Sequence, residues 1–192
     1  PVRQLPLVDD PQRVARGRGD LLGLMTAEFI GADVVVTPVT SNSGIEAALK
    51  SAVVRTKVGS PFVIAAMKET SAAGAGRVLG FEANGGCLLG SDGEINGSVL
   101  KALPTRDSFL PILAVLSKAA ASELPLSLIA ASWALPFALS DRLENFPIEA
   151  SAALMAHLRG SRESLAAFFA PIGRPASVSD VDGLRVTLAE GG

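Results

Sequence analysis

Hydrophobic residues recur at helical spacing in the first strongly patterned segment of the chain. Leucine, methionine and phenylalanine side chains lie three to four residues apart between Asp20 and Gly31, which predicts a helix with Asp20 as its N-cap. Residues 32–39 (ADVVVTPV) form a β-branched run that is typical of a buried strand. Residues 40–54 (TSNSGIEAALKSAVV) predict a second helix, with Ser43 and Glu46 in capping-box spacing.

The alternation continues through the middle of the chain. We expect an amphipathic helix at 62–76, a strand at 77–82, and a strand with an Asp92–Gly93 turn at 87–95. A long apolar helix capped by Thr105 should follow. Helices that alternate with short strands predict an α/β layered domain over residues 1–143, with a mixed sheet flanked by helices.

The pattern changes after the polar, proline-ended segment SDRLENFP (140–147). Two helical patterns follow, and residues 180–192 (DVDGLRVTLAEGG) open like a β-hairpin that is cut short. We therefore expect a truncated α+β segment over residues 144–192. The apolar run 124–139 is shorter than the ~20 residues that span a membrane and contains two prolines, so it predicts buried core and no membrane association.

Composition narrows the possible classes of protein. Hydrophobic residues make up 48% and charged residues 19% of the chain, which favours a folded domain. The 17 basic and 19 acidic residues form no long block of one sign, so no nucleic acid partner is expected. Cys87 is the only cysteine, which excludes an intrachain disulfide and fits a cytoplasmic location. His157 is the only histidine, so no histidine-based triad or metal cluster is expected.

The segment GFEANGG (80–86) is the first candidate site. It sets Glu82 and Asn84 among glycines, including Gly85 and Gly86, which leave the backbone bare and accessible to a ligand. An ionised glutamate accepts paired hydrogen bonds from neighbouring hydroxyls, so a sugar ring is a natural ligand. The alternative is a tight turn between two strands, with Glu82 in solvent.

The segment RTKVG (55–59) is the second candidate site. Arg55 and Lys57 share one side of an extended segment that ends at Gly59, so they could hold a phosphate group or assist proton transfer near one. The alternative is an ordinary exposed basic strand. The pair Gly74-x-Gly76 lacks the preceding strand and following helix of a nucleotide-binding fingerprint, so no Rossmann-type site is expected.

Taken in order, several segments resemble the α-D-phosphohexomutases, the family of phosphomannomutases and phosphoglucomutases. The matching segments are RGDLLGLMTAEFIGADVVVTPVTSNSGIE, RTKVG, FVIAAMKET, GFEANGG, LSLIAASWALPFALSDRLENFPIEASAALMAHL and DGLRVTLAEGG. The resemblance implies that residues 1–143 are the family's third domain and that 144–192 open its fourth. It also places the phosphorylated serine and the Asp-x-Asp-x-Asp loop for Mg²⁺ outside this sequence, in missing domains of the same polypeptide.

The resemblance assigns roles residue by residue. Glu82 matches a glutamate that bridges two sugar hydroxyls, Asn84 the small polar residue two places on, and Lys57 a lysine near the phosphoryl-transfer centre. Arg55, Gly59, Gly85 and Gly86 are expected to bind substrate, although many bacterial members have histidine in place of Gly86.

The implied substrate is a hexose phosphate, with phosphoryl transfer between C6 and C1 through a bisphosphate intermediate. Mg²⁺ and glucose or mannose 1,6-bisphosphate are the implied cofactor and activator of the intact enzyme. Three alternatives stay open: a phosphoglucosamine mutase, a non-catalytic module that binds sugar phosphates, and an α/β scaffold domain with no ligand.

Overall fold

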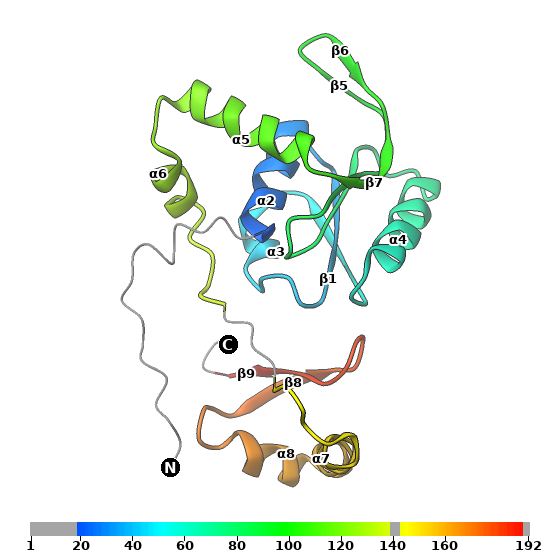
Figure 1. Ribbon diagram of the computed structural model, residues 1–192, viewed down its shortest axis with the longest axis vertical. Coiled ribbons are helices and arrows are strands. Elements are labelled where there is room, and N and C mark those ends of the chain that lie inside the picture. The colour runs from blue at the N-terminus through cyan, green and yellow to red at the C-terminus, as the bar shows by residue number, and fades with distance from the viewer. Residues whose placement is uncertain (1–18, 139–142, 190–192) are drawn as a thin grey trace. The chain divides into compact units, whose positions relative to one another are not determined.

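The computed structural model describes residues 19–138 and 143–189 (Figure 1). The chain divides between Pro136 and Phe137 into two compact units. The domain boundary that we expect between residues 143 and 144 lies just inside the second unit and stays a prediction. The first unit contains α2 (Gly19–Ile30), β1 (Val34–Pro38), α3 (Ile45–Ala48), β2 (Ala52–Thr56), α4 (Ser60–Ala72), β3 (Val78–Phe81), β4 (Cys87–Leu89), β5 (Gly93–Ile95), β6 (Ser98–Leu100), β7 (Leu103–Asp107), α5 (Phe109–Ser122) and α6 (Leu126–Ala131).

The first unit is built around a five-stranded mixed sheet in the order β2-β1-β3-β4-β7. Strand β1 is parallel to β2 and β3, whereas β4 is antiparallel to both β3 and β7. Strand β7 therefore runs in the same direction as β1, β2 and β3. The expected mixed sheet is confirmed, and the carboxyl ends of four strands share one edge, where ligands commonly bind in α/β sheets.

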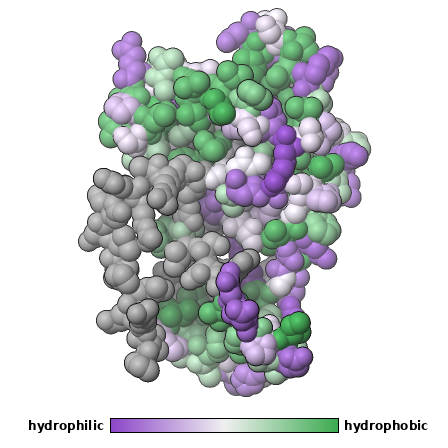
Figure 2. All heavy atoms as spheres, in the orientation of Figure 1, coloured by the Kyte–Doolittle hydropathy of each residue, from purple (hydrophilic) through white to green (hydrophobic). Residues whose placement is uncertain are grey.

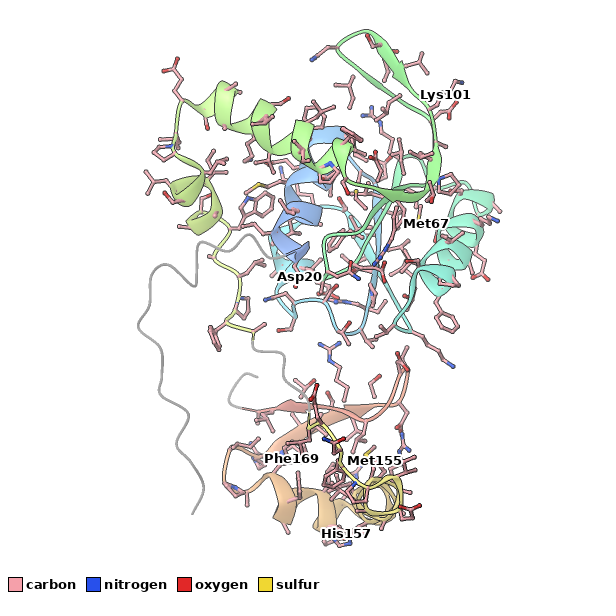
Figure 3. All side chains as sticks on the ribbon, in the orientation of Figure 1. Asp20, Met67, Lys101, Met155, His157 and Phe169 are labelled. Atoms are coloured by element: carbon pink, nitrogen blue, oxygen red, sulfur yellow. The ribbon has the colours of Figure 1, made fainter. Side chains whose placement is uncertain are left out.

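Helices cover both faces of this sheet. Helices α2 and α5 pack together on one face, and α4 packs against β1, β2 and β3 on the other (Figure 1). The valines of β1 contribute to the hydrophobic cores on both faces of the sheet, because Val35 belongs to the core under α2 and Val36 to the core under α4. Met67 of α4 is almost fully buried in this second core (Figure 3). A continuous apolar strand is what burial on both faces requires.

Both expected N-terminal caps of the early helices are wrong. Asp20 lies inside the first turn of α2 (Figure 3), and its Oδ2 accepts a hydrogen bond from the backbone N–H of Asn42 at 3.2 Å. Helix α3 begins only at Ile45 and has no side-chain cap, while Glu46 forms an ion pair with Arg55. In each case the carboxylate that local spacing assigned to a helix end binds a group in another part of the chain.

The chain between β4 and α5 also differs from the expectation. The two-residue turn lies at Asn96 and Gly97, both with positive φ, and joins β5 to β6, so the expected Asp92–Gly93 turn is wrong. Thr105 lies in strand β7 and caps nothing, because β7 pairs with β4 and α5 begins only at Phe109. Pairing with a distant strand overrides the local helix signal there.

The expectation that residues 124–139 form buried core is wrong as well. Helix α6 is short and buries Ile129, while Leu124, Leu126 and Leu128 are each about half exposed. A helix of 6 residues such as α6 can bury only one narrow face. Leu139 lies outside the described residues. No helix in the described part of the chain is long and apolar enough to cross a membrane.

The second unit contains α7 (Ile148–Gly160), α8 (Arg162–Phe169), β8 (Pro175–Ser179) and β9 (Arg185–Leu188). The two expected helices are present, and Ser161 caps α8 by accepting a hydrogen bond from the N–H of Ser164 at 3.0 Å. Strands β8 and β9 form an antiparallel pair. The sequence indicated the β9 half of this hairpin and missed β8.

Candidate functional site

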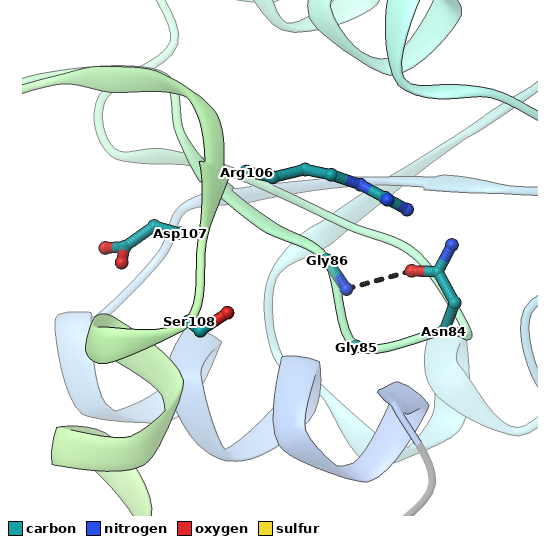
Figure 4. Close-up of a pocket in the computed structure, with 6 residues that line it drawn as sticks. All are labelled: Asn84, Gly85, Gly86, Arg106, Asp107 and Ser108. Carbon is teal, nitrogen blue, oxygen red and sulfur yellow. Dashed lines mark hydrogen bonds between the residues drawn. The ribbon is translucent and has the colours of Figure 1, made fainter.

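The segment between β3 and β4 is a tight turn held by hydrogen bonds. The N–H of Glu82 donates to the carbonyl of Gly86 at 2.8 Å, and the N–H of Gly85 donates to the carbonyl of Glu82 at 2.9 Å. The side-chain Oδ1 of Asn84 accepts from the N–H of Gly86 at 2.9 Å (Figure 4). Gly85 has a φ of +93°, a conformation that favours glycine. The turn is therefore a defined loop, with Asn84 acting as one of its internal braces.

The first turn of α2 packs directly against this loop. A β-carbon added to Gly19 would lie 2.2 Å from the backbone nitrogen of Gly85 and 2.4 Å from the carbonyl oxygen of Ala83. No side chain fits in that space. The helix start thus fixes the position of the loop.

The carboxylate of Glu82 is buried, with 5% of the residue exposed. Its Oε2 accepts a hydrogen bond from Oγ of Ser60 at 2.7 Å, and from Nη2 and Nε of Arg106 at 2.9 and 3.2 Å. Ser60 is the first residue of α4 and Arg106 lies in β7. The alternative of a solvated Glu82 is therefore wrong. Sequence reasoning missed both partners, because they lie 22 and 24 residues away from Glu82.

An open pocket of about 260 Å³ lies beside the turn. Its lining consists of Asn84, Gly85, Gly86, Arg106, Asp107 and Ser108 (Figure 4). The side chain of Arg106 is 54% exposed, so the cation that holds Glu82 also faces this hollow. The pocket thus presents bare backbone and an exposed forked donor that is bound to the buried carboxylate of Glu82, which suits a polar ligand rich in hydroxyl groups.

Lys57 and Gly59 follow β2 at the same edge of the sheet. Lys57 is exposed, and its Nζ lies 5.9 Å from the ring centroid of Phe62. Gly59 has a φ of +123° and precedes α4, where its carbonyl accepts from the N–H of Phe62 at 3.0 Å. Since β2 and β3 both end at this edge, the topology brings Lys57 and Glu82 to the same edge of the sheet.

Arg55 is engaged in internal contacts. Its Nε and Nη2 donate to the two carboxylate oxygens of Glu46, each at 2.7 Å. The same guanidinium also donates to the carbonyls of Pro38, Ser41 and Asn42. These contacts tie the segment after β1 to β2. A substrate-binding role for Arg55 stays a prediction, and it would require the release of at least one of these partners.

The single cysteine of the sequence, Cys87, is buried, and its single histidine, His157, is exposed. Cys87 is buried, and burial, with a smaller contribution from the negative charge of Asp107, raises the pKa of its thiol to about 12. The thiol is therefore protonated at neutral pH and packs as a small hydrophobe. His157 is exposed in the last turn of α7. Within residues 19–138 and 143–189, no group of three or more histidine, cysteine, aspartate or glutamate side chains could hold a metal ion.

Comparison with known proteins gives a consistent result. The family model for phosphoglucomutase/phosphomannomutase, alpha/beta/alpha domain III, matches residues 19–135. A phosphomannomutase of Sinorhizobium fredii (strain NBRC 101917 / NGR234) is 55% identical over 175 residues, which are 91% of this chain and 37% of that protein. A phosphomannomutase of Salmonella muenchen is 38% identical over 173 residues, or 89% of this chain and 36% of that protein.

The fold has a counterpart among solved structures. A crystal structure from Thermus thermophilus, described as a phosphomannomutase, has a TM-score of 0.54 at 17% identity and covers 88% of this chain and 32% of that one. The chain spans little more than a third of the length of the curated relatives that it matches. With a family model that matches more than half of its residues, the chain belongs to the α-D-phosphohexomutases, the family of phosphoglucomutases and phosphomannomutases.

Proposed function

We propose that this chain is the hexose-binding portion of a phosphohexomutase that moves a phosphoryl group between C6 and C1 of a hexose phosphate through a bisphosphate intermediate. Mannose phosphates and glucose phosphates are the proposed substrates. The observation that carries the proposal is the buried carboxylate of Glu82 next to an open polar pocket, at the sheet edge where Lys57 also lies.

Glu82 is proposed to accept hydrogen bonds from two ring hydroxyls. Within the part of the chain that the structure describes, the donors to its carboxylate reach Oε2, and none reaches Oε1. An anionic oxygen that is held in place but lacks a protein donor is a strong acceptor for a hydroxyl group. A ring gripped through two neighbouring hydroxyls can present either end to the transfer centre, which a mutase requires.

The remaining predicted residues have supporting roles in this proposal. Asn84, Gly85 and Gly86 form the pocket wall, where bare backbone allows a sugar ring to come close. Lys57 is proposed to stabilise negative charge on the phosphoryl group in transfer, and Gly59 to shape the loop that carries it. Phosphoryl transfer depends mostly on positioning and charge stabilisation, so a cation at this edge is well suited to the reaction.

Mg²⁺ and a hexose 1,6-bisphosphate activator are proposed for the intact enzyme by family resemblance. Mg²⁺ would neutralise charge on the phosphoryl oxygens. The described residues contain no cluster that could hold it, so its ligands would have to come from residues outside those described. The phosphorylated serine is proposed to lie in the same outside part.

The direct test is a turnover assay on the full-length protein that contains this chain. Conversion of mannose 1-phosphate or glucose 1-phosphate to the 6-phosphate is the expected result. Conversion of glucosamine 1-phosphate alone would favour the phosphoglucosamine mutase alternative. Binding of a hexose phosphate with no turnover would favour the non-catalytic module, and the absence of both would refute the proposal.

The role of Glu82 is tested by Glu82→Gln, which keeps the shape of the side chain and removes its charge. We expect the Kd for mannose 1-phosphate to rise at least about tenfold, because a charge-assisted hydrogen bond contributes about 1.5–3 kcal/mol. Isothermal titration calorimetry on the full-length protein measures the change. Asp92→Asn, which alters an exposed ion pair with Lys101, serves as the matched control. Equal affinity of Glu82→Gln and wild type would remove Glu82 from the site.

A further inference from the structure

We propose that Arg106 is a second sugar-binding residue of this site, and that its guanidinium and the carboxylate of Glu82 together recognise neighbouring ring hydroxyls. This inference rests on the proposed function and deepens it. It assigns a donor to the pocket, and it makes the hydroxyl face of the sugar, not the phosphate, the part that binds there.

The first support is the geometry of the guanidinium. Nε and Nη2 of Arg106 both donate to Oε2 of Glu82. Arginine has five N–H donors, so two donors used leave three for other partners. Because the Arg106 side chain is 54% exposed and lines the pocket, its guanidinium is accessible to a ligand there. Glu82 therefore fixes one part of the planar Arg106 guanidinium, and the remaining N–H groups are available to a ligand.

The second support is the absence of a side chain at Gly86. A β-carbon on that residue would lie 2.9 Å from Nε of Arg106 and 3.2 Å from Oε2 of Glu82. The first distance is shorter than such contacts allow, so Nε of Arg106 would have to shift from its present position beside the carboxylate. Gly86 therefore leaves the space in which Arg106 takes its present position beside Glu82.

The third support is the charge balance of the pocket, which decides the class of ligand. The positive charge of Arg106 is matched by Glu82. Asp107, the next residue of β7, points away from the guanidinium in Figure 4, and its carboxylate accepts from the backbone N–H groups of Phe109 and Leu110 at 2.8 and 3.4 Å. The carboxylate of Glu82 thus balances the one guanidinium that lines the pocket, which leaves no surplus positive charge there for a phosphate dianion. A hydroxyl is neutral and can both donate and accept, so it suits a donor and an acceptor side by side.

The test combines Arg106→Lys with substrate analogues in the full-length protein. Lysine keeps a positive charge beside Glu82 but lacks the planar fork that can hold two oxygen atoms at once. We expect the Kd for mannose 1-phosphate to rise about tenfold, the size of one charge-assisted bond. For the 2-deoxy, 3-deoxy and 4-deoxy analogues, one should bind wild type and Arg106→Lys with nearly equal affinity, because it lacks the hydroxyl that Arg106 contacts.

Gly86→Ala provides an independent route to the same result. It leaves Arg106 in the chain but shifts its guanidinium, so it should lower the affinity for mannose 1-phosphate and show the same insensitivity to one deoxy analogue. Gly93→Ala is the control, because its added β-carbon makes only ordinary contacts of 3.4 Å or more. Circular dichroism and thermal unfolding show whether each variant is folded.

The outcomes separate this inference from the proposed function. If wild type binds no hexose phosphate, the proposed function fails. If wild type binds and Arg106→Lys binds equally well, Arg106 does not contact the sugar and the inference alone fails. An equal loss of affinity for all three deoxy analogues would mean that Arg106 only positions Glu82, which also overturns the inference.

Discussion

The site shows that a residue can be identified from sequence while its environment cannot. Glu82 stands out because glycines surround it, yet Ser60 and Arg106, which hold its carboxylate, belong to elements remote in sequence. The one local signal for them is Gly86, whose missing side chain makes room for the guanidinium. That signal could be read only with Arg106 in place, because glycine is common in turns for its backbone conformation alone.

Cys87 gives an expected pH dependence at this scale. Burial raises the pKa of its thiol from 9.0 to about 12, so between these values the folded protein keeps a proton that the unfolded chain releases. The free energy of unfolding should therefore fall as pH rises from about 9 to 12. Urea unfolding of the wild type and Cys87→Ala at pH 8 and about pH 10.5 measures this. The variant should lose less stability over that interval, and equal losses would contradict the assignment.

At the scale of elements, hydrophobic periodicity predicted the helices and strands better than it predicted their ends. The positions of α2, β1, α4 and β3 follow the sequence pattern closely. The strand β7 did not, because its residues carry a local helix-start signal and become a strand by pairing with β4. Edges of elements depend on such partners, so caps were assigned to the wrong residues.

The start of α5 allows a direct comparison between Thr105, the expected cap, and Asp107, which precedes the N-cap residue Ser108 and whose side chain accepts from the first N–H groups of the helix. Asp107→Ala should lower the free energy of unfolding by about 1 kcal/mol, the usual effect of losing a side-chain acceptor at a helix N-terminus. Its carboxylate accepts from the N–H groups of Phe109 and Leu110. Thr105→Ala, at the exposed position in β7 that the sequence favoured, should change it little. Urea denaturation measures both changes, and equal losses would argue against stabilisation of α5 by the Asp107 side chain.

At the scale of the whole molecule, the two units differ in how much apolar surface they bury. The first unit has two cores that sandwich the sheet, whereas in the described part of the second unit the buried apolar side chains are Leu158 and Leu165. Stability should therefore be unevenly distributed along the chain. Apolar side chains are also exposed in the first unit, where those of α5 include Phe109, Ile112, Leu113 and Leu116. Figure 2 shows hydrophobic residues at the surface.

Hydrogen exchange of the 192-residue chain tests this difference. Backbone amides in β1 and β3 should exchange at least about tenfold more slowly than those in β8 and β9, because the first pair lies inside a five-stranded sheet with covered faces. Strands β8 and β9 form a two-stranded pair with mostly exposed or half-buried residues. Mass spectrometry of peptides from each strand gives the rates. Similar protection in both pairs would show that the second unit is as stable as the first.

The sequence by itself determined the layered α/β class, the order of its main elements and the glycine-rich turn that carries Glu82, because these depend on local periodicity and on residue types next to one another. The tertiary structure decided which groups meet that carboxylate, which acidic side chains cap helices, and why position 86 is glycine. Those features depend on pairs brought together by sheet pairing and helix packing. Their contact distances follow from the assembled fold and leave no periodic trace in the chain.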